Sequence, residues 1–496
     1  MPQFNPLTQR KELMEIDIQN NSDNKSTIKK AFLFIFIGFL LFAVAFYFLS
    51  GDQLRYRTSR GNINSVEPTK GSVELSKGEV IEQVFYANID RIERINVQFG
   101  TYYRSNKGLL LMELCSSDGT ILLHQIFDVS AVNEGDTLEM IAVEPIEHYW
   151  SDPLSLRITS DSKSGEAITP LTGTSNSDKF QLKLNGLLTE GVLCFSVSGE
   201  DYIWTGQHYW DFVIAFEIGL GIILFIIWKR FNAGKTSFLT SPILAFKKYQ
   251  FLIRQLVARD FKTRYKRSVL GMLWSFLNPL LTMLVQYFVF STLFKSNIPF
   301  FAAYLIIGVV MFNFFSESCG QTLISIIGNS SLITKVFVPK YIYPMTRTMM
   351  SVINLGISLV PMLIVSVLTG VQLHKSCILS LFFMLCLVVF SLGLGMLLAT
   401  SMVFFRDTQF LWGILSMVWM YATPVFYPET ILPENVRSVL RLNPLYHFIK
   451  NARICILDGI SPEPMEYFRC FILALIMLII GSYIFKRYQN KFILYL

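Results

Sequence analysis

Charged residues are scarce in this chain, and the scarcity predicts its solvent. Asp, Glu, Lys and Arg make up 16% of the 496 residues, whereas hydrophobic residues make up 52%. A soluble domain of this size cannot bury that much apolar surface, so the composition predicts a membrane protein. The cations flank apolar runs instead of forming one basic face, which argues against nucleic acid as a partner.

Metal and redox motifs are also missing. The seven cysteines include no C-x-x-C pair, so we expect no metal site and no catalytic residues in this chain. Five cysteines fall in or near apolar runs, where they serve as small apolar side chains: Cys319, Cys377, Cys386, Cys455 and Cys470. Cys115 and Cys194 fall in an acidic segment, and the sequence leaves open whether they pair.

A complete phosphate-binding loop is absent as well. The segment NAGKTS at Asn232–Ser237 resembles the end of such a loop, but Lys229 stands where its first glycine is required. We therefore expect any ATP and Mg²⁺ to be bound by a partner subunit, with no cofactor in this chain.

Long uncharged runs are abundant instead. A helix needs about 20 apolar residues to cross the hydrocarbon core. Eight runs meet that need, so the fold class is predicted to be an α-helical polytopic membrane protein with eight spans. The predicted spans are 31–49, 210–228, 269–294, 301–327, 345–369, 377–405, 408–426 and 468–485.

The distribution of cations orients these spans. Residues 229–267 contain eleven cations and one acid, Asp260, whereas the short loops that hold Lys295 and Lys375 have one cation each. Because cytoplasmic loops are rich in Lys and Arg, residues 1–30, the linker 229–267 and the C-terminus are predicted to be cytoplasmic. Residues 50–209 are then extracytoplasmic.

Residues 50–209 have a different pattern. They carry 13 Lys and Arg against 22 Asp and Glu, and their apolar residues alternate, as at Ile95, Val97 and Phe99. Alternation and a hairpin signal at Asp118-Gly119 predict an all-β sandwich. Five aromatic residues are candidates for a sugar platform, with core packing as the alternative for each: Tyr102, Tyr103, Tyr149, Trp150 and Trp204.

A basic segment precedes the third span. Between Phe246 and Ser268, apolar residues share one arc of a helix, which predicts an amphipathic helix at the membrane interface. A plain stop-transfer charge cluster is the alternative. The candidate cations of this helix are Lys247, Lys248, Arg254, Arg259, Lys262, Arg264 and Lys266.

Four motifs in a fixed order resemble a known family. RYKRSVLGMLWSFLNPLL, SLITKVFVPKYIYP, FFRD and TPVFYPETILPENVRSVLRLNPLYHFIKNAR follow one another over Arg264–Arg453. They resemble the membrane subunits of ABC-2-type exporters for O-antigen, capsule and teichoic acid. The resemblance implies a six-span core at 268–496 in the bacterial cytoplasmic (inner) membrane. Two copies, surrounded by membrane lipid, would pair with two ATPase subunits and move an undecaprenyl-linked glycan outward.

The resemblance also assigns roles to segments. The cytoplasmic loop 331–344 would be a coupling helix that docks into the ATPase, with an ordinary interfacial turn as the alternative. Residues 424–466 would be a re-entrant segment at the outer mouth of the channel. The amphipathic helix would gate entry of the lipid head group. The candidate coupling residues are Leu332, Thr334, Lys335, Pro339 and Lys340.

Aromatic residues of the core spans are candidates for the glycan channel, because sugar rings pack their C–H faces on aromatic faces. Lipid contact is the alternative for each. Glu317 and Glu217 are costly in lipid and should face protein or water. The channel candidates are Trp274, Tyr287, Phe290, Phe312, Phe315, Glu317, Trp412, Trp419 and Tyr421.

Residues 1–235 depart from the resembled pattern, because two extra spans bracket the β-domain. The resemblance implies that this domain is a jelly-roll-like sandwich of the kind found on some cell-surface glycan proteins. Other functions therefore stay open. An ABC-2 exporter of a drug or lipid fits the core, and a glycan chain-length regulator or sensor fits the first half. The regulator or sensor hypothesis leaves the six predicted spans of residues 268–496 unexplained.

Overall fold

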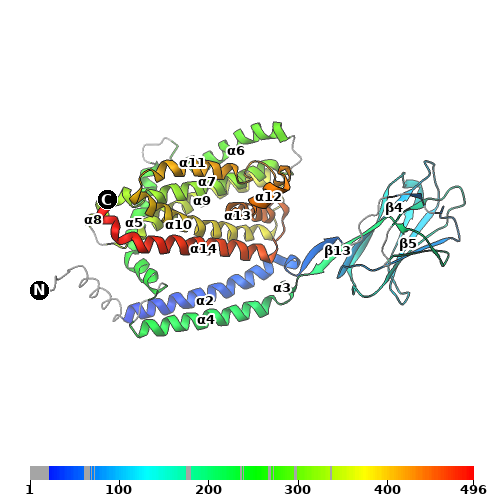
Figure 1. The fold of residues 1–496 in the computed structure, drawn as a ribbon, viewed down its shortest axis with the longest axis horizontal. Coiled ribbons are helices and arrows are strands. Elements are labelled where there is room, and N and C mark those ends of the chain that lie inside the picture. Colours follow the sequence, from blue (N-terminus) through cyan, green and yellow to red (C-terminus); the bar gives the residue numbers. More distant parts are fainter. Residues whose placement is uncertain are drawn as a thin grey trace. The chain divides into compact units, whose positions relative to one another are not determined.

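The computed structural model describes residues 22–60, 68, 70–71, 73–174, 180–234, 237, 239–265, 270–271, 273–294, 299–335 and 338–496. The chain forms two compact units. One is Arg55–Gln207, which corresponds to the predicted β-domain. The other combines Met1–Leu54 with His208–Leu496 and is helical (Figure 1).

The smaller unit is a sandwich of two antiparallel sheets, as the alternating apolar residues predict. Its described strands are β1 (Tyr56–Arg60), β2 (Lys70–Gly71), β3 (Val80–Phe85), β4 (Arg91–Gly100), β5 (Leu109–Cys115), β6 (Ile121–Asp128), β7 (Thr137–Glu147), β8 (Leu154–Ser160), β9 (Thr169–Gly173), β10 (Gln181–Leu184), β11 (Leu187–Thr189), β12 (Val192–Leu193) and β13 (Phe195–Tyr202). One sheet runs β1-β13-β4-β9-β12, with β7 beside β4 and β2 beside β9; the other runs β11-β10-β3-β8-β5-β6.

The sandwich core follows the sequence pattern. Ile95, Val97 and Phe99 of β4 are buried together with residues of the facing sheet. The predicted hairpin is confirmed, because β5 and β6 pair antiparallel and Gly119 adopts a φ of +84° in the turn between them. Cys115 and Cys194 are both buried and free, so they do not form a disulfide.

The larger unit is built from helices. Its long helices are α2 (Ser22–Ser50), α4 (Tyr209–Asn232), α5 (Thr240–Tyr265), α6 (Leu273–Phe294), α7 (Phe301–Leu323), α9 (Ile342–Leu368), α10 (Ser380–Phe404), α11 (Thr408–Tyr421) and α14 (Pro464–Tyr488). Short helices are α8 (Ser330–Lys335), α12 (Glu434–Leu440), α13 (Pro444–Arg453) and α15 (Phe492–Tyr495). Helix α3 (Trp204–Gln207) ends the β-domain.

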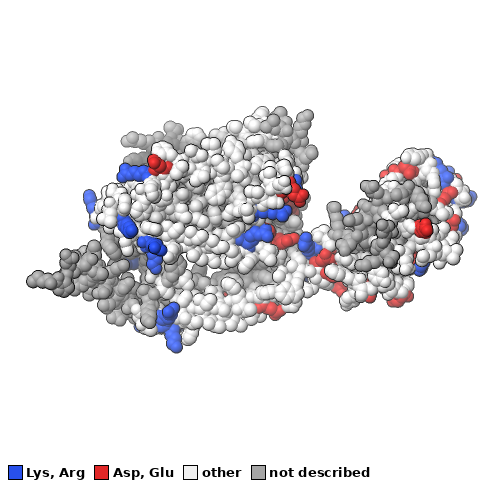
Figure 2. All heavy atoms as spheres, in the orientation of Figure 1, with Lys and Arg blue, Asp and Glu red and all other residues white. Residues whose placement is uncertain are grey.

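Seven helices within the described residues are long and apolar enough to span a membrane, where the sequence predicts eight. The difference is α11, which has 14 residues and rises only about 21 Å. The helix ends before Pro424, because a residue that precedes proline is disfavoured in helical conformation. Figure 2 shows that charged residues on the visible face of this unit lie near its two ends.

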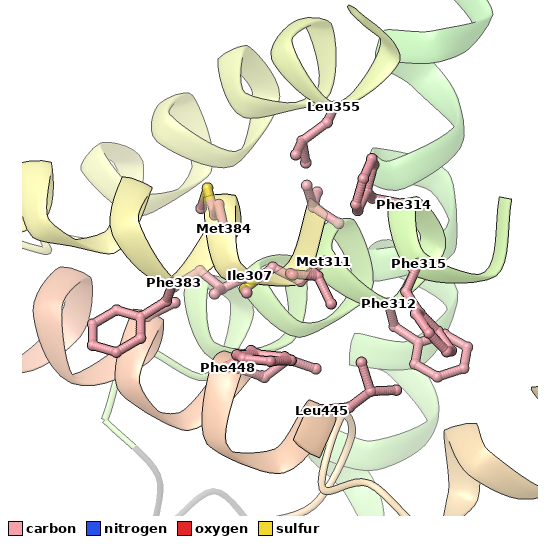
Figure 3. Packing of buried hydrophobic residues seen from close by; sticks show 14 of the residues in the cluster. Ile307, Met311, Phe312, Phe314, Phe315, Leu355, Phe383, Met384, Leu445 and Phe448 are labelled. Atoms are coloured by element: carbon pink, nitrogen blue, oxygen red, sulfur yellow. The ribbon is translucent and has the colours of Figure 1, made fainter. Parts of the chain in front are cut away.

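Apolar side chains of α7, α9, α10 and α13 form the main core of the helical unit. Phe312 and Phe315 of α7 lie in this cluster, and Phe383 of α10 and Phe448 of α13 join it (Figure 3). The α13 helix is thus packed against α7 and α10 in this core.

The N-terminal helix α2 packs on α4 and on the rest of the helical unit. Near its end, Phe46 meets the ring of Tyr467 on α14 at 4.7 Å between centroids. Near its start, Lys247 Nζ of α5 donates a hydrogen bond to Thr27 Oγ1 at 2.6 Å. Helix α2 therefore contacts the predicted core at α14 near its end and the basic helix α5 near its start.

Helix α5 has the predicted amphipathic character. Ile253 and Leu256 are buried against Ile342 and Tyr343 at the start of α9, while Arg254 and Lys262 are exposed. The apolar arc therefore packs on protein. Lys266, which the sequence places in the same cation set, lies outside the described residues.

Candidate functional site

A polar cavity of about 400 Å³ opens between α5, α6, α7 and α9. Polar cavities between apolar helices are where membrane transporters hold their substrates, since polar groups are costly in lipid. Its lining residues are Arg264, Trp274, Ser275, Asn278, Pro279, Val310, Asn313, Phe314, Glu317, Ser351, Asn354, Leu355 and Ser358.

An ion pair joins two walls of this cavity. Arg264 at the end of α5 donates both terminal nitrogens to the carboxylate of Glu317 on α7, the second at 3.1 Å. The amide of Asn354 on α9 donates to the same carboxylate at 2.7 Å. These hydrogen bonds and the opposite charge of Arg264 offset the desolvation cost of a carboxylate placed between apolar helices. The sequence predicted Arg264 and Glu317 separately, and the structure brings them together.

A proline shapes the neighbouring wall. Pro279 lies inside α6 and has no N–H to donate to the carbonyl of Ser275, four residues earlier. The hydroxyl of Ser358 on α9 donates to that carbonyl instead, at 3.2 Å. The substitute hydrogen bond ties α6 to α9 beside the ion pair.

A second cavity, of about 520 Å³, shares Arg264 with the first and lies between α5, α7 and α9. Asp260, whose side chain is only 7% exposed, pairs there with Arg259 at 3.0 Å and with Arg347 of α9 at 3.2 Å. Arg347 Nε is buried and makes no hydrogen bond within the described residues. Three arginines thus face this cavity against one aspartate, which favours an anionic ligand.

The predicted channel aromatics do not form one wall. Phe312, Phe315 and Trp412 are buried in the apolar core, with Trp412 at 5.8 Å from Phe315. Trp274 alone among the predicted aromatics lines the 400 Å³ cavity. The remaining residues are Tyr287 and Tyr421, which are exposed, Phe290, which stacks on Phe426 at 5.4 Å, and Trp419, whose indole N–H donates to Asn443.

A buried arginine that sequence reasoning missed holds the predicted re-entrant segment. Arg453 of α13 donates to the carbonyl oxygens of Pro424 at 2.6 Å, Val425 at 2.8 Å and Tyr304 at 3.0 Å. Its guanidinium carbon lies 3.4 Å from the centroid of the Tyr304 ring. The sequence signal is a pair of cations, Lys450 and Arg453, within the otherwise mostly apolar stretch FIKNARICIL.

The predicted coupling loop contains the short helix α8. Thr334 and Lys335 are exposed at its end and Leu332 is half-buried, while Val336 and Phe337 lie outside the described residues. Pro339 is half-buried as well. Lys340 is turned toward the C-terminal end of the chain, where its ammonium donates to the carbonyl of Gln489 at 2.5 Å.

Comparison with known proteins identifies the helical part. The model of the ABC-2 type transporter family matches residues 251–457. An O-antigen export system permease from Myxococcus xanthus is 32% identical over 246 residues, which cover 49% of this chain and 95% of that protein. The chain belongs to the ABC-2-type transporter family.

Other relatives are similar to this ABC-2 transporter over about half of its length. An O-antigen export permease from Klebsiella pneumoniae is 29% identical over 244 residues, covering 49% of this chain and 93% of that protein. A capsule polysaccharide export inner-membrane protein from Neisseria meningitidis is 23% identical over 260 residues, covering 52% and 96%. Both cavities, α8 and Arg453 lie inside the residues matched by the family model.

The β-domain of this ABC-2 transporter lies outside the matched residues, and its five predicted platform residues are all exposed. The structure does not bring them together. Tyr102 and Tyr103 follow the end of β4, whereas Tyr149 and Trp150 lie beside its beginning, where the N–H of His148 bonds to Asp90. Strand β4 has ten residues, so its length of about 30 Å separates Tyr102 and Tyr103 from Tyr149 and Trp150. Trp204 lies with the second group, because β13 ends beside Asp90.

Proposed function

We propose that this chain is the transmembrane subunit of an ATP-driven exporter that moves a lipid-linked polysaccharide across the bacterial cytoplasmic membrane. The relatives named above export O-antigen or capsule polysaccharide, and the chain covers nearly all of their length. The observation that carries the proposal is the pair of polar cavities that share Arg264 and lie among helices rich in buried apolar residues.

The cavities suit the phosphate-bearing head group of a lipid-linked glycan. Arg259, Arg264 and Arg347 converge on the cavity of about 520 Å³. A diphosphate that reaches this cavity competes with Glu317 for Arg264, since guanidinium binds phosphate and carboxylate by the same paired hydrogen bonds. Release of Glu317 would loosen α5 from α7 and extend the opening toward the first cavity. In this proposal α5 is the gate.

We propose that ATP and Mg²⁺ are bound by a separate ATPase subunit, present in two copies with two copies of this chain. The exposed end of α8, with Thr334 and Lys335, is the docking segment. Both termini and α8 face the cytoplasm, because the cations of 229–267 and of Lys486–Lys491 then lie on the cytoplasmic side. The β-domain is extracytoplasmic in this arrangement.

Gene deletion and complementation test the proposal. In the cell that produces this protein, deletion should abolish the surface polysaccharide and leave lipid-linked glycan inside. The wild-type gene should restore export, and Arg264→Ala should not. Arg254→Ala is the matched control, because Arg254 is exposed on the same helix and lines neither cavity. Unchanged surface polysaccharide after deletion would refute the function.

A further inference from the structure

The loop that follows β4 holds two neighbouring tyrosines in an unusual backbone conformation. Tyr102 has a φ of 57° and Tyr103 a φ of 55°. Both lie in the left-handed region, which bulky side chains rarely adopt. Such a conformation costs free energy and persists only where the surrounding structure holds it, and it is common at binding sites.

The carboxylate of Glu134 holds one side of the loop. It accepts hydrogen bonds from the N–H of Thr101 at 2.6 Å, from the hydroxyl of Thr101 at 2.9 Å and from the N–H of Tyr103 at 3.4 Å. These donors, the N–H of Thr101 above all, lower the pKa of Glu134. The buried amide of Asn106 closes the loop from within by donating to the carbonyl of Thr101 at 3.0 Å.

Arg104 holds the other side. It pairs with Glu74 and donates to the carbonyl of Ala167 at 3.1 Å. Its guanidinium carbon lies 4.9 Å from the centroid of the Tyr102 ring, which fixes that ring by a cation–π contact. The loop is therefore held on both sides before any ligand arrives, which lowers the entropy cost of binding.

The fixed loop presents an aromatic ring to solvent. Tyr103 is 90% exposed and Tyr102 is 46% exposed. The strain of the loop therefore does not serve the packing of the Tyr103 ring. Glu134 and Arg104 contact the loop through polar groups. One exposed apolar residue, Val73, precedes the Glu74 that pairs with Arg104, whereas Ile141 and Val143 lie away from the loop, on β7.

We propose that the loop Thr101–Asn106 is a binding site for a sugar ring of the exported polysaccharide. A sugar has an apolar C–H face and many hydroxyl groups, which match an exposed aromatic ring on a loop that a carboxylate and a guanidinium hold in place. A protein partner would instead require a contiguous apolar patch around the ring. The proposal rests on the proposed function for the identity of the polysaccharide, and it narrows the five aromatic candidates to Tyr102 and Tyr103.

Binding by the full-length chain in lipid nanodiscs tests the site, with polysaccharide purified from the surface of the producing cell as the probe. Tyr103→Asn removes the ring but keeps a residue that tolerates positive φ, so the fold should survive. We expect it to weaken binding about 10-fold or more, as loss of a central aromatic contact does. Tyr103→Trp should retain binding. Tyr149→Ala is the control, because Tyr149 is also exposed but lies at the other end of β4.

Three results would overturn the site: no binding by the wild-type chain, unchanged binding by Tyr103→Asn, or equal losses in Tyr103→Asn and Tyr149→Ala. Complementation separates this failure from that of the proposed function. A wild-type chain that restores surface polysaccharide in cells but binds none of it in nanodiscs overturns the sugar site alone.

Discussion

Gly393 of α10 and Gly481 of α14 bring the backbones of two membrane helices into direct contact. A Cβ atom on Gly481 would overlap the carbonyl oxygen of Gly393, and one on Gly393 would lie 2.5 Å from the carbonyl carbon of Met477. Small residues allow this approach in a membrane, where packing replaces the hydrophobic effect as the driving force between helices. The same α10 supports α13, because Phe390 packs on Phe448 at 5.7 Å between ring centroids.

Gly481→Ala should therefore destabilise the helical unit by about 1–3 kcal/mol, because the added methyl group forces rigid backbone apart. The expected result is a lower melting midpoint of the purified protein, measured by fluorescence-detected size exclusion after heating. Gly413→Ala is the control, since a Cβ at Gly413 meets no atom within 4 Å. Equal midpoints for the two variants would contradict this role for the crossing.

The ion pair between Arg264 and Glu317 should show energetic coupling. Each single variant, Arg264→Gln or Glu317→Gln, leaves one charge unpaired in the cavity, so the double variant should lose less stability than the sum of the two. We expect a coupling of about 1–3 kcal/mol, measured from melting midpoints. The exposed pair Arg94–Glu139 of the β-domain, at 3.3 Å, should show almost none. If the stability losses of the two single variants add up in the double variant, the ion pair between Arg264 and Glu317 does not stabilise the helical unit.

The sequence predicted helices and strands better than it predicted the contacts between residues of different elements. Apolar runs gave the spans, alternation gave the strands, and Asp118-Gly119 gave the hairpin, because each depends on residues close in the chain. Arg264 and Glu317 are 53 residues apart, and their contact depends on how α5, α7 and α9 pack. The sequence could therefore place Arg264 and Glu317 in or beside membrane spans, but it could not show that the two side chains form an ion pair.

Two further features lie beyond local patterns. The strained backbone of Tyr102 and Tyr103 has no sequence signature, because tyrosine rarely adopts positive φ. The long-range partners of the loop, Glu74, Glu134 and Ala167, are 30 to 63 positions from the residues that they bond. The short α11 was predicted as a full span because its apolar run continues to Phe426. Arg453, which holds the carbonyls of Pro424 and Val425, shows why the chain turns earlier.

Cysteine labelling should place α8 in the cytoplasm. Lys335→Cys, in a background without native cysteines, should resist a membrane-impermeant thiol reagent in intact cells and react after the cells are opened, because Lys335 is exposed at the end of α8. Val143→Cys in the β-domain should react in intact cells, since Val143 is fully exposed on β7. The reverse labelling would invert the proposed topology.

The pH dependence of polysaccharide binding should follow Glu134. Its pKa is lowered from 4.5, chiefly by the N–H of Thr101, so the carboxylate form stabilises the folded loop. That stabilisation is present above pH 4.5 and is lost as the pH falls through the lowered value. Affinity in nanodiscs should therefore stay constant from pH 7 to pH 5 and fall only in stronger acid. Glu134→Gln should weaken binding at pH 7, whereas a fall in wild-type affinity already near pH 6 would implicate a different group.

Excision of the β-domain should leave the transporter assembled. The N–H of Ile203 bonds to the carbonyl of Arg55 at 2.8 Å, so the two ends of the domain lie side by side. A short Gly-Ser linker can therefore replace Arg55–Gln207 and preserve the hairpin of α2 and α4. Because the domain has its own core, the helical unit should fold and bind its ATPase, while the amount or length of surface polysaccharide should change.

Removal of Met1–Arg230 is the contrasting variant. It also removes α2, and with it the contact of Phe46 with Tyr467 and the hydrogen bond from Lys247 to Thr27. We expect this variant to bind the ATPase but to melt at a lower temperature than the linker variant, because the start of α5 and one face of α14 lose their packing partner. Co-purification with a tagged chain and melting midpoints measure both effects. Equal midpoints would show that the hairpin does not support the core, and polysaccharide of unchanged amount and length in the linker variant would show that the β-domain has no part in export.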